Sequence, residues 1–384
     1  MNNASLGNFI EITGGYAFKS SEFITEGIPV IRMSDLNEGE VKVTKTTVKV
    51  SDRKVDDKFI INKGDILIGL SGSIGKIGVV KNDGKMFLNQ RLAKVSPKEN
   101  IDNNFLLYLM KEISKRMQLD SVGGTVLNIS PNTLEKYSVS VPDVITQKKI
   151  AETLNIADEL INKRKEQLNE LNCLIQSIFV ELFGNPVTNM FNWKLEKLSD
   201  LGVFGRGISK HRPRNAPELL GGEYPLIQTG DVAKATIFIR NYTNSYSEVG
   251  LAQSKLWPKG TLCITIAANI AKTGILTFDS CFPDSIVGLS TNEKTNEIFI
   301  HTWFTFFQEI LEKSAPESAQ KNINLKILSE LFIICPPIDL QNKFVTLVEE
   351  IEFQKKLMED SLQEMEKNFN SLMQKAFRGE LFPE

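Results

Sequence analysis

The chain has 384 residues, of which 41% are hydrophobic and 24% are charged, and its formal net charge is −2 at pH 7. This length allows two domains of ordinary size, and the composition is typical of a soluble globular protein rather than a disordered one. The nearly neutral charge excludes a global attraction to nucleic acid or membranes, so any anion-binding surface must be local.

The absence of targeting signals and the spacing of the cysteines indicate the cellular compartment of the protein. The N-terminus shows no basic segment followed by an apolar run, and no apolar run reaches membrane-spanning length. The cysteines lie far apart, without a Cys-x-x-Cys pair: Cys173, Cys263, Cys281 and Cys335. Reduced thiols are therefore expected rather than a disulfide framework or a zinc site. These features predict a cytoplasmic protein with no membrane partner.

An internal repeat divides the chain. Shifting the sequence by 196 residues places GDILIGLSGSIGKIG (64–78) on GTLCITIAANIAKTG (260–274), with five identities in fifteen positions. The same shift pairs Pro29, Ile31, Asp35 and Asn128 with Pro225, Ile227, Asp231 and Asn324. Near the module ends, VPDVITQKKI (141–150) resembles PPIDLQNKF (336–344) at a shift of 194. Two related modules are therefore expected.

Both modules show the same order of elements. Short runs rich in Ile and Val, separated by Gly, Asn and Ser, predict strands joined by turns. A brief helical pattern follows at 105–117 and at 299–311, then a strand with proline, and then a long helix. The sequence predicts an α+β fold with substantial β-sheet. The expected boundaries are globular modules at 1–146 and 185–340 and long helices at 147–184 and 341–384.

The long helices carry apolar residues at steps of four and three. The predicted seam residues are Ile150, Leu154, Ile161, Leu168, Leu171, Ile175, Ile178, Val348, Ile351, Met358, Leu362, Met365, Phe369 and Leu372. A sustained heptad rhythm predicts a coiled coil rather than an amphipathic helix lying on a domain. Arg164 and Lys355 interrupt the series and are expected to snorkel from the seam or to fix its register. Antiparallel pairing within the chain would place the modules at opposite ends of a rod with an approximate two-fold axis.

The glycine-rich segment 64–80 has two interpretations. A glycine loop followed by lysine can cradle phosphates, which would make it the nucleotide pocket of an enzyme. A P-loop, however, requires a glycine and a hydroxyl residue where Leu70 and Ile77 stand. The interpretation as turns at a strand end is therefore favoured. Lys76 and Lys272, which share one position of the repeat, are candidate phosphate contacts.

Local basic and amide-rich segments predict DNA contacts. The segment 205–214 holds four Lys or Arg and no acid, and 60–98 holds seven Lys or Arg against two Asp. Lys and Arg neutralise phosphates, while Arg, Lys, Asn and Gln read base edges. The candidates in the first module are Tyr16, Lys19, Arg32, Ser34, Ser73, Lys76, Asn89, Gln90 and Arg91. Those in the second are Arg206, Lys210, Arg212, Arg214, Gln228, Thr229, Asn269, Lys272, Gln320, Lys321 and Asn322.

Residues suited to catalysis are scarce. His211 and His301 are the only histidines, which argues against a histidine metal cluster or a repeated catalytic triad. His301 is expected at a helix start, and Asp35 and Asp231 are interpreted as turn residues after a strand. The Asn-Pro-Pro-aromatic signature of amino-methyltransferases is missing. A non-catalytic chain without metal is therefore expected.

The whole sequence resembles one family, the specificity subunits of type I restriction-modification systems. The resemblance rests on VPDVITQKKIAETL and CPPIDLQNKFVTLV at the module–helix junctions, on GGYAFKSSEF and GDILIGLSGSIGKIG, and on QSIFVELFGNP, which QKAFRGELF echoes. It implies that each module is a target recognition domain that reads one half of a bipartite DNA target. It also implies that the paired helices set the gap between the halves and dock the modification subunits.

The resemblance further implies partners. Two methyltransferase subunits would use S-adenosylmethionine to methylate adenines, and restriction subunits would cleave double-stranded DNA with ATP and Mg; this chain itself would hold no cofactor. Because the modules differ outside their framework, the half-sites are expected to differ and the target to be asymmetric. Two alternatives stay open: a nucleotide-binding enzyme that uses 64–80, and a coiled-coil scaffold without DNA contact.

Overall fold

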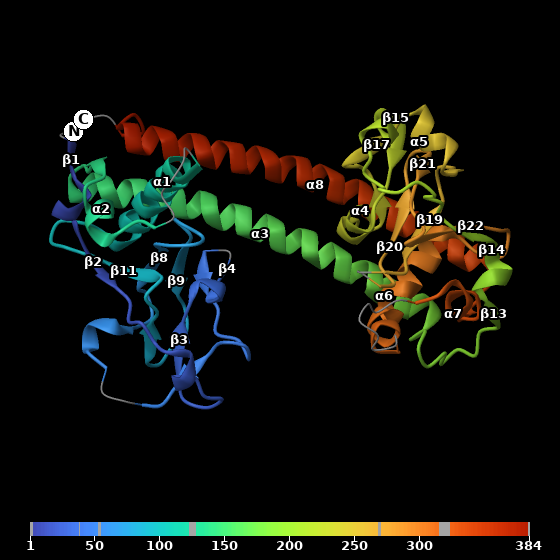
Figure 1. The fold of residues 1–384 in the computed structure, drawn as a ribbon, viewed down its shortest axis with the longest axis horizontal. Coiled ribbons are helices and arrows are strands. Elements are labelled where there is room, and N and C mark those ends of the chain that lie inside the picture. Colours follow the sequence, from blue (N-terminus) through green and yellow to red (C-terminus); the bar gives the residue numbers. More distant parts are fainter. Residues whose placement is uncertain are drawn as a thin grey trace. The chain divides into compact units, whose positions relative to one another are not determined.

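The structure, a computed structural model, describes residues 3–37, 39–52, 55–122, 128–267, 270–314 and 323–382. It divides into two compact units (Figure 1): unit 1 is Met1–Lys165 with Asp360–Glu384, and unit 2 is Glu166–Glu359. Each unit combines one globular module with a stretch of two long helices, α3 (Val144–Phe183) and α8 (Ile338–Arg378). The predicted α+β class is confirmed, since each unit mixes sheets with helices.

Unit 1 is built on two main sheets. The larger has the strand order β2-β11-β8-β9-β5-β4, and the smaller has the order β6-β3-β10-β7. The strands of the larger sheet are β2 (Ile10–Gly14), β11 (Leu92–Pro97), β8 (Ile66–Gly69), β9 (Ile77–Val80), β5 (Glu40–Val41) and β4 (Leu36–Asn37). Those of the smaller are β6 (Lys49–Val50), β3 (Ile28–Ile31), β10 (Met86–Leu88) and β7 (Ile60–Ile61). A third sheet pairs β1 (Asn3–Ser5) with β12 (Ser138–Ser140).

Unit 2 repeats this plan. Its larger sheet has the order β14-β22-β19-β20-β16, and its smaller sheet has the order β17-β15-β21-β18. The strands of the larger sheet are β14 (Gly202–Arg206), β22 (Ile286–Thr291), β19 (Leu262–Thr265), β20 (Thr273–Leu276) and β16 (Phe238–Ile239). Those of the smaller are β17 (Asn244–Tyr246), β15 (Leu220–Leu226), β21 (Ser280–Cys281) and β18 (Leu256–Trp257). Here β13 (Leu195–Lys197) pairs with β23 (Phe332–Ile334).

Backbone geometry confirms the internal repeat. In the turn between β8 and β9, the Gly75 amide donates to the Gly69 carbonyl, and between β19 and β20 the Ala271 amide donates to the Thr265 carbonyl. Ala271 adopts a φ of 58°, close to the 78° of Gly75. The second module therefore keeps the left-handed turn although alanine is strained there, because the hairpin register requires it.

The shift between the modules changes along the chain. Ser130 and Asn324 both accept a hydrogen bond in the N-cap position, from the amides of Thr133 and Ile327. They cap the short helices α2 (Pro131–Glu135) and α7 (Leu325–Ser329). Asn324 therefore corresponds to Ser130 at a shift of 194, and the pairing of Asn324 with Asn128 predicted at a shift of 196 is wrong. The reason is that the second copy has already lost two positions before this cap.

The continuous apolar run of β8 follows from burial on both faces. Ile66 and Ile68 pack in the cluster that contains α1 (Asn103–Val122), whereas Leu67 packs with Ile31 and Leu88 of the smaller sheet. The larger sheet is thus covered by a helix on one face and by the smaller sheet on the other. A strand buried on both faces needs apolar residues at every position rather than at alternate ones.

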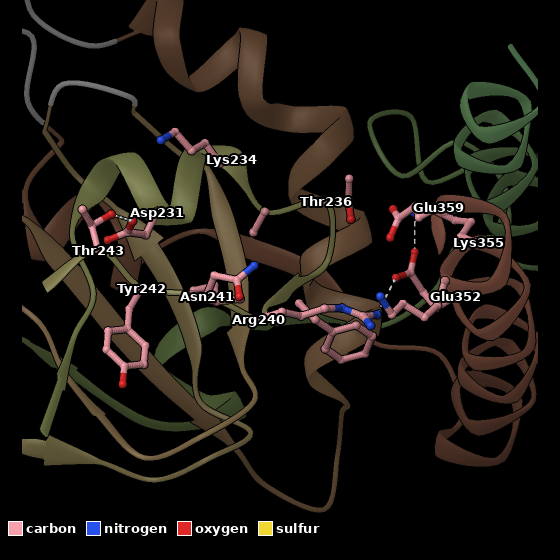
Figure 2. Close-up of a pocket in the computed structure, with 14 residues that line it drawn as sticks. Asp231, Lys234, Thr236, Arg240, Asn241, Tyr242, Thr243, Glu352, Lys355 and Glu359 are labelled. Atoms are coloured by element: carbon pink, nitrogen blue, oxygen red, sulfur yellow. Dashed lines mark hydrogen bonds and ion pairs between the residues drawn. The ribbon is translucent and has the colours of Figure 1, made fainter. Parts of the chain in front are cut away.

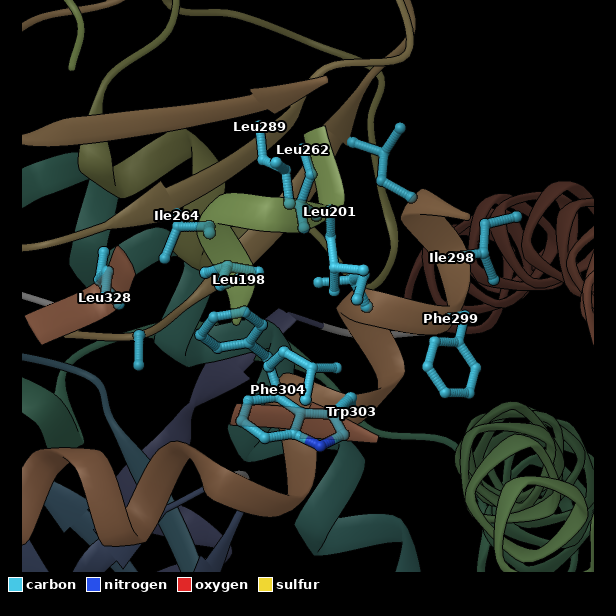
Figure 3. Close-up of a cluster of buried hydrophobic side chains, with 14 of the residues drawn as sticks. Leu198, Leu201, Leu262, Ile264, Leu289, Ile298, Phe299, Trp303, Phe304 and Leu328 are labelled. Carbon is cyan, nitrogen blue, oxygen red and sulfur yellow. The ribbon is translucent and has the colours of Figure 1, made fainter. Parts of the chain in front are cut away.

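The equivalent strand of unit 2 is buried in the same way. Leu262 and Ile264 of β19 lie in the largest cluster of the unit with Phe299 and Trp303 of α6 (Glu297–Ser314), as Figure 3 shows. Cys263 faces the opposite side, in a cluster with residues of the smaller sheet. The helices predicted at 105–117 and 299–311 are therefore confirmed as α1 and α6, each covering its own sheet.

The long helices pair antiparallel. In unit 1, Ile150 and Leu154 near the start of α3 share a cluster with Met373 near the end of α8. In unit 2, Phe179 near the end of α3 contacts Phe344 near the start of α8, with ring centroids 5.5 Å apart. Every predicted seam residue is buried or half-buried. Each helix therefore contributes its apolar stripe to the cores of both units.

A glutamine fixes each junction between a module and its long helix. The Gln147 side chain accepts from the Asp102 amide and donates to the carbonyls of Asn100 and Pro142. Gln341 makes the corresponding bonds in unit 2, donating to the carbonyls of Lys294 and Pro336. This explains the shared Pro-x-x-x-x-Gln spacing of the junction motifs, since the amide satisfies backbone groups where the chain turns into the helix.

Lys355, which was predicted to snorkel from the seam or to fix its register, does not snorkel. It is 3% exposed and its ammonium bonds the Glu352 carboxylate, which is itself 6% exposed. Glu352 also accepts from Arg240 Nη2 at 3.2 Å, and Figure 2 shows the three charges meeting beside α8. They line one side of a pocket of about 370 Å³. Arg164, the other predicted interruption, is half-buried.

His301 lies in the first turns of α6, as predicted, but inside the core. It is 5% exposed, and its Nδ1 pairs with the Thr273 hydroxyl at 2.9 Å. Burial lowers the pKa of His301 to about 4, and the nearby Lys355 ammonium also lowers the pKa, while a hydrogen bond to the Thr236 backbone acts in the opposite direction. The folded state therefore contains His301 as the neutral imidazole.

This burial makes the stability of unit 2 depend on pH. In the unfolded chain His301 titrates near pH 6.5, so as pH falls below that value the unfolded state binds the proton and the native state does not. Between pH 7 and 5 the free energy of unfolding is expected to fall by roughly 2 kcal/mol through this group, and the loss should end near pH 4. Urea unfolding at pH 7, 6 and 5, followed by tryptophan fluorescence, measures it. His301→Gln should flatten the slope, and an unchanged slope in this variant would contradict the prediction.

Candidate nucleic-acid interface

Five loops of unit 1 meet at one edge of the module, which we call loop face 1. They follow β2, β3, β8 and β10 and precede α2, and they cover 15–20, 32–35, 70–76, 89–91 and 128–130. Because β3 and β10 are parallel, their C-terminal ends leave the sheet on the same side. Backbone bonds join neighbouring loops, such as the Gln90 amide to the Tyr16 carbonyl at 3.0 Å and the Ile129 amide to the Leu70 carbonyl at 2.9 Å. The face is thus a rigid assembly of loops held by the sheets.

All nine candidates of the first module lie on loop face 1. Tyr16, Lys19, Ser34, Ser73, Gln90 and Arg91 are exposed there, Arg32 and Lys76 are half-buried, and Asn89 is buried. The Tyr16 ring stacks edge-on against Phe59, with centroids 5.5 Å apart, so it presents a fixed aromatic surface. Asp35 accepts from the Arg32 amide and from the Thr47 hydroxyl, which confirms its role as a turn residue.

Unit 2 places the equivalent loops together as loop face 2. They cover 207–215, 227–229, 266–267, 282–285 and 323–324. The same connections recur, since the Ile266 amide donates to the Ser285 carbonyl and the Ile323 amide donates to the Ile266 carbonyl. Asp231 makes the same kind of bonds as its counterpart Asp35, since it accepts from the Gln228 amide and the Thr243 hydroxyl. Gln228 is exposed and Thr229 half-buried at this face.

The basic segment 205–214 of loop face 2 contains no acidic residue, but the fold brings one next to it. Asp284, from the loop after β21, accepts from Arg214 at 2.6 Å and lies 3.9 Å from Arg212. Arg206 Nε donates to the Asp284 backbone carbonyl at 2.9 Å. These pairs are solvent-exposed and worth little by themselves, but they hold the arginines side by side. Each guanidinium keeps further N–H groups that can reach a phosphate.

The backbone of the basic segment is also held in place. The Gln253 side chain accepts from the amides of Lys210 and His211, at 2.6 Å and 3.0 Å. The Ser254 hydroxyl donates to the Ile208 carbonyl at 2.8 Å. The Lys210 side chain is exposed, and no acidic partner for it lies among the described residues. Loop face 2 is therefore a preorganised cationic surface.

The glycine segment of unit 1 forms a hairpin turn rather than a nucleotide cradle. The amides of Gly69, Gly75 and Lys76, which a phosphate would need, donate to carbonyls of the same turn. The Gly75 carbonyl accepts from Ser114 of α1. In unit 2 the Lys272 ammonium donates to Gln308 of α6 at 3.0 Å. Lys272 therefore joins its hairpin to the covering helix, whereas Lys76, half-buried on loop face 1, stays a candidate phosphate contact.

Four candidates of the second module lie outside the described residues: Asn269, Gln320, Lys321 and Asn322. Loop face 2 also contains three residues that the sequence did not single out, Ser209, Asp284 and Ser285, and Asn244 at the start of β17 lines a pocket beside them. The repeat could have found two of these, since Asp284 and Ser285 occupy the place of Gln90 and Arg91 at a shift of 194.

Other kinds of site are not visible in the described part of the chain. Within it, no three His, Cys, Asp or Glu side chains gather as a metal site would require. None of the helices in the described ranges has the length and hydropathy that a bilayer span needs. The loop faces, with their arginines, amides and aromatic side chains, are the surfaces whose chemistry suits a nucleic acid.

Comparison with known proteins defines the class. Residues 1–172 and 190–367 match the model of a family described as type I restriction modification DNA specificity domain. The chain belongs to this family: it is a type I restriction-modification specificity subunit with two target recognition domains. The resemblance found in the sequence is thereby confirmed, and the alternative of a nucleotide-binding enzyme is not supported.

Individual relatives span nearly the whole chain. It is 24% identical to the EcoBI specificity subunit of Escherichia coli, covering 98% of this chain and 85% of that protein. It is 23% identical to the MjaIX specificity subunit of Methanocaldococcus jannaschii, covering 97% and 91%. The fold is similar to that of the type I restriction-modification S subunit from M. genitalium, with a TM-score of 0.54, 17% identity and coverage of 98% and 96%. A chain of a type I restriction-modification complex gives a TM-score of 0.60, with 16% identity and coverage of 99% and 98%.

Proposed function

We propose that loop face 1 and loop face 2 each read one half of a bipartite, asymmetric DNA target. The observation that carries this proposal is the recurrence of one loop assembly in both units with different side chains. Loop face 2 replaces three residues of loop face 1: it has Ile208 in place of Tyr16, Pro283 in place of Asn89, and Asp284 in place of Gln90. Equal scaffolds with unequal side chains would select different base sequences.

The chain is proposed to act without catalysis of its own, in the cytoplasm, as the component that brings partner enzymes to the target. Two methyltransferase subunits with S-adenosylmethionine, and restriction subunits with ATP and Mg, would supply the chemistry. The long helices would dock the methyltransferases and set the number of unread base pairs between the half-sites. The relatives named above, called specificity subunits of restriction enzymes, support this assignment.

The proposal is tested with the complex of this chain and its methyltransferase subunits. Mapping adenine methylation in a cell that carries both identifies the target. The complex should bind that duplex in preference to a scrambled one, with an affinity that falls as salt rises. Equal affinity for both duplexes would reject the proposal.

Substitutions on loop face 2 should separate phosphate contacts from base contacts. Lys210→Ala with Arg212→Ala should weaken binding to all sequences and reduce the slope of log affinity against log salt by about 0.9 per lost contact. Gln228→Ala should instead relax the preference at one position of one half-site, costing about 1–3 kcal/mol for the correct sequence. Lys259→Ala, on an exposed turn outside loop face 2, is the matched control and should change neither quantity.

A further inference from the structure

A cavity of about 350 Å³ opens on loop face 2, between the basic segment and the smaller sheet of unit 2. Its apolar lining comes from Leu226, Tyr246 and Pro283, and polar groups of Ser209, Gln228 and Asn244 surround them. Ligand pockets of this size combine an apolar lining with a few polar groups that fix orientation. The cavity therefore has the chemistry of a site for a flat, amphipathic group.

One of its polar groups lacks a partner. Ser209 is 7% exposed, and its Oγ finds no hydrogen-bond partner in the described part of the chain. The backbone of Ser209 is nevertheless held, since its carbonyl accepts from Arg212 at 2.7 Å. A buried hydroxyl without a partner is costly, so a native fold keeps one when something else completes it. A ligand in this cavity would do so.

The first module has aromatic side chains at the equivalent place. Leu226, Tyr246 and Cys281 of the smaller sheet in unit 2 share one cluster, and their counterparts Val30, Val50 and Phe87 share another in unit 1. Cys281 thus stands where unit 1 has a phenylalanine. The loop after β2 adds Phe18, whose ring lies 5.8 Å from that of Phe87. The loop after β14 carries Ser209 and Lys210 where the first module has Ala17 and Phe18, so neither of these two phenylalanine rings has a counterpart in unit 2.

The shape of the cavity limits what can fill it. The grooves of duplex DNA are concave and are read by protruding loops and helices, so a paired base cannot enter a hollow in the protein. A base rotated out of the stack can, and such bases are held by apolar contact to the ring and by hydrogen bonds to its edge. A bare phosphate would find Arg214 at this cavity but would leave the apolar surfaces of Leu226 and Tyr246 without contact.

We propose that this cavity receives one unstacked base of the half-site read by loop face 2. The inference rests on the proposed DNA-reading function and adds the form in which one base is recognised. Ser209 and the amides of Gln228 and Asn244 would bond the base edge, while Leu226 and Tyr246 contact its ring. Arg214, which also lines the cavity, would lie beside the phosphate of the extruded nucleotide.

The test uses the complex of this chain with its methyltransferase subunits on the mapped target duplex. Fluorescent analogues, 2-aminopurine at purines and pyrrolo-cytosine at pyrimidines, replace each base of both half-sites in turn. Methyltransferases extrude the adenines they modify, so those positions are set aside. We expect one further position, in one half-site, to brighten severalfold when the wild-type complex binds.

Two variants assign that position to the cavity. Asn215→Trp places a bulky ring at an exposed position on its rim, and Ser209→Val removes the unpartnered hydroxyl. Asn215→Trp should abolish the extra brightening, and Ser209→Val should reduce it. Lys259→Trp, which adds the same ring on an exposed turn outside the cavity, should leave it unchanged.

The outcomes separate the two proposals. If the wild-type complex binds its target specifically but no position beyond the methylated adenines brightens, the cavity does not receive a base and the DNA-reading function stands. If the extra position brightens equally in Asn215→Trp, the base goes elsewhere and the inference is overturned. If the complex does not distinguish its target from a scrambled duplex, the proposed function itself fails.

Discussion

Glu352→Ala is expected to lower the free energy of unfolding of unit 2 by about 3–5 kcal/mol, because it leaves a buried charge without a partner. The carboxylate of Glu352 accepts from both Lys355 and Arg240, and Lys355 is almost fully buried. Arg240 is half exposed and can turn to solvent, but the Lys355 ammonium cannot. Urea unfolding followed by tryptophan fluorescence reports unit 2 alone, since Trp193, Trp257 and Trp303 all lie in it.

Two further variants make this prediction specific. Glu349→Ala, at an exposed position of the same helix, should change the free energy of unfolding by no more than about 0.5 kcal/mol. Adding Lys355→Met to Glu352→Ala removes the stranded ammonium and should recover most of the loss. A cost below about 1 kcal/mol for Glu352→Ala would mean that solvent reaches Lys355 and that the buried pair does not anchor α8.

A seven-residue insertion in both long helices is expected to change the target rather than abolish recognition. Placed between Lys165 and Glu166 in α3 and between Glu359 and Asp360 in α8, it adds one heptad to each helix at the boundary between the units. The apolar stripe then keeps its phase. Seven residues add about 10 Å, which corresponds to roughly three base pairs, so the unread gap should lengthen by that amount while both half-sites stay the same.

Methylation mapping in cells that carry the lengthened chain and its methyltransferase measures the gap. The same seven residues inserted in the exposed turn at Gly84 are the control and should leave the gap unchanged. An unchanged gap with the lengthened helices would show that they do not determine spacing. A changed half-site sequence would show that the insertion disturbed the loop faces as well.

The sequence predicted the parts of the fold that depend on local pattern. The repeat identified two modules, because equal strands and turns need similar residues at equal spacing. The apolar rhythm identified both long helices and their seam, since burial along one stripe imposes that period. The role of Asp35 and Asp231 was also predictable, because a carboxylate after a strand closes a turn through local bonds.

Residue type suggested which side chains could contact DNA, but it did not show which of them lie together at one interface. Arg, Asn and Gln in loops are chemically suited to DNA, but their convergence depends on the parallel pairing of β3 with β10 and of β15 with β21. Asp284 reaches Arg214 across seventy positions of sequence, so the segment 205–214 looked free of acid. Lys355 looked like a snorkelling residue, because its burial against Glu352 depends on Arg240, which reaches the same carboxylate from a distant loop.

For this protein the sequence by itself determined two similar α+β modules, a pair of long amphipathic helices and membership of the specificity-subunit family. Each of these properties is written as a pattern of neighbouring residues. Only the tertiary structure decided which loops meet at each face, how the charges beside α8 are paired, and where unit 2 is hollow. Cys281 packs with Leu226 and Tyr246, two residues that line the hollow, where unit 1 has the larger Phe87. Such a vacancy depends on volumes brought together from distant segments, and no single segment encodes it.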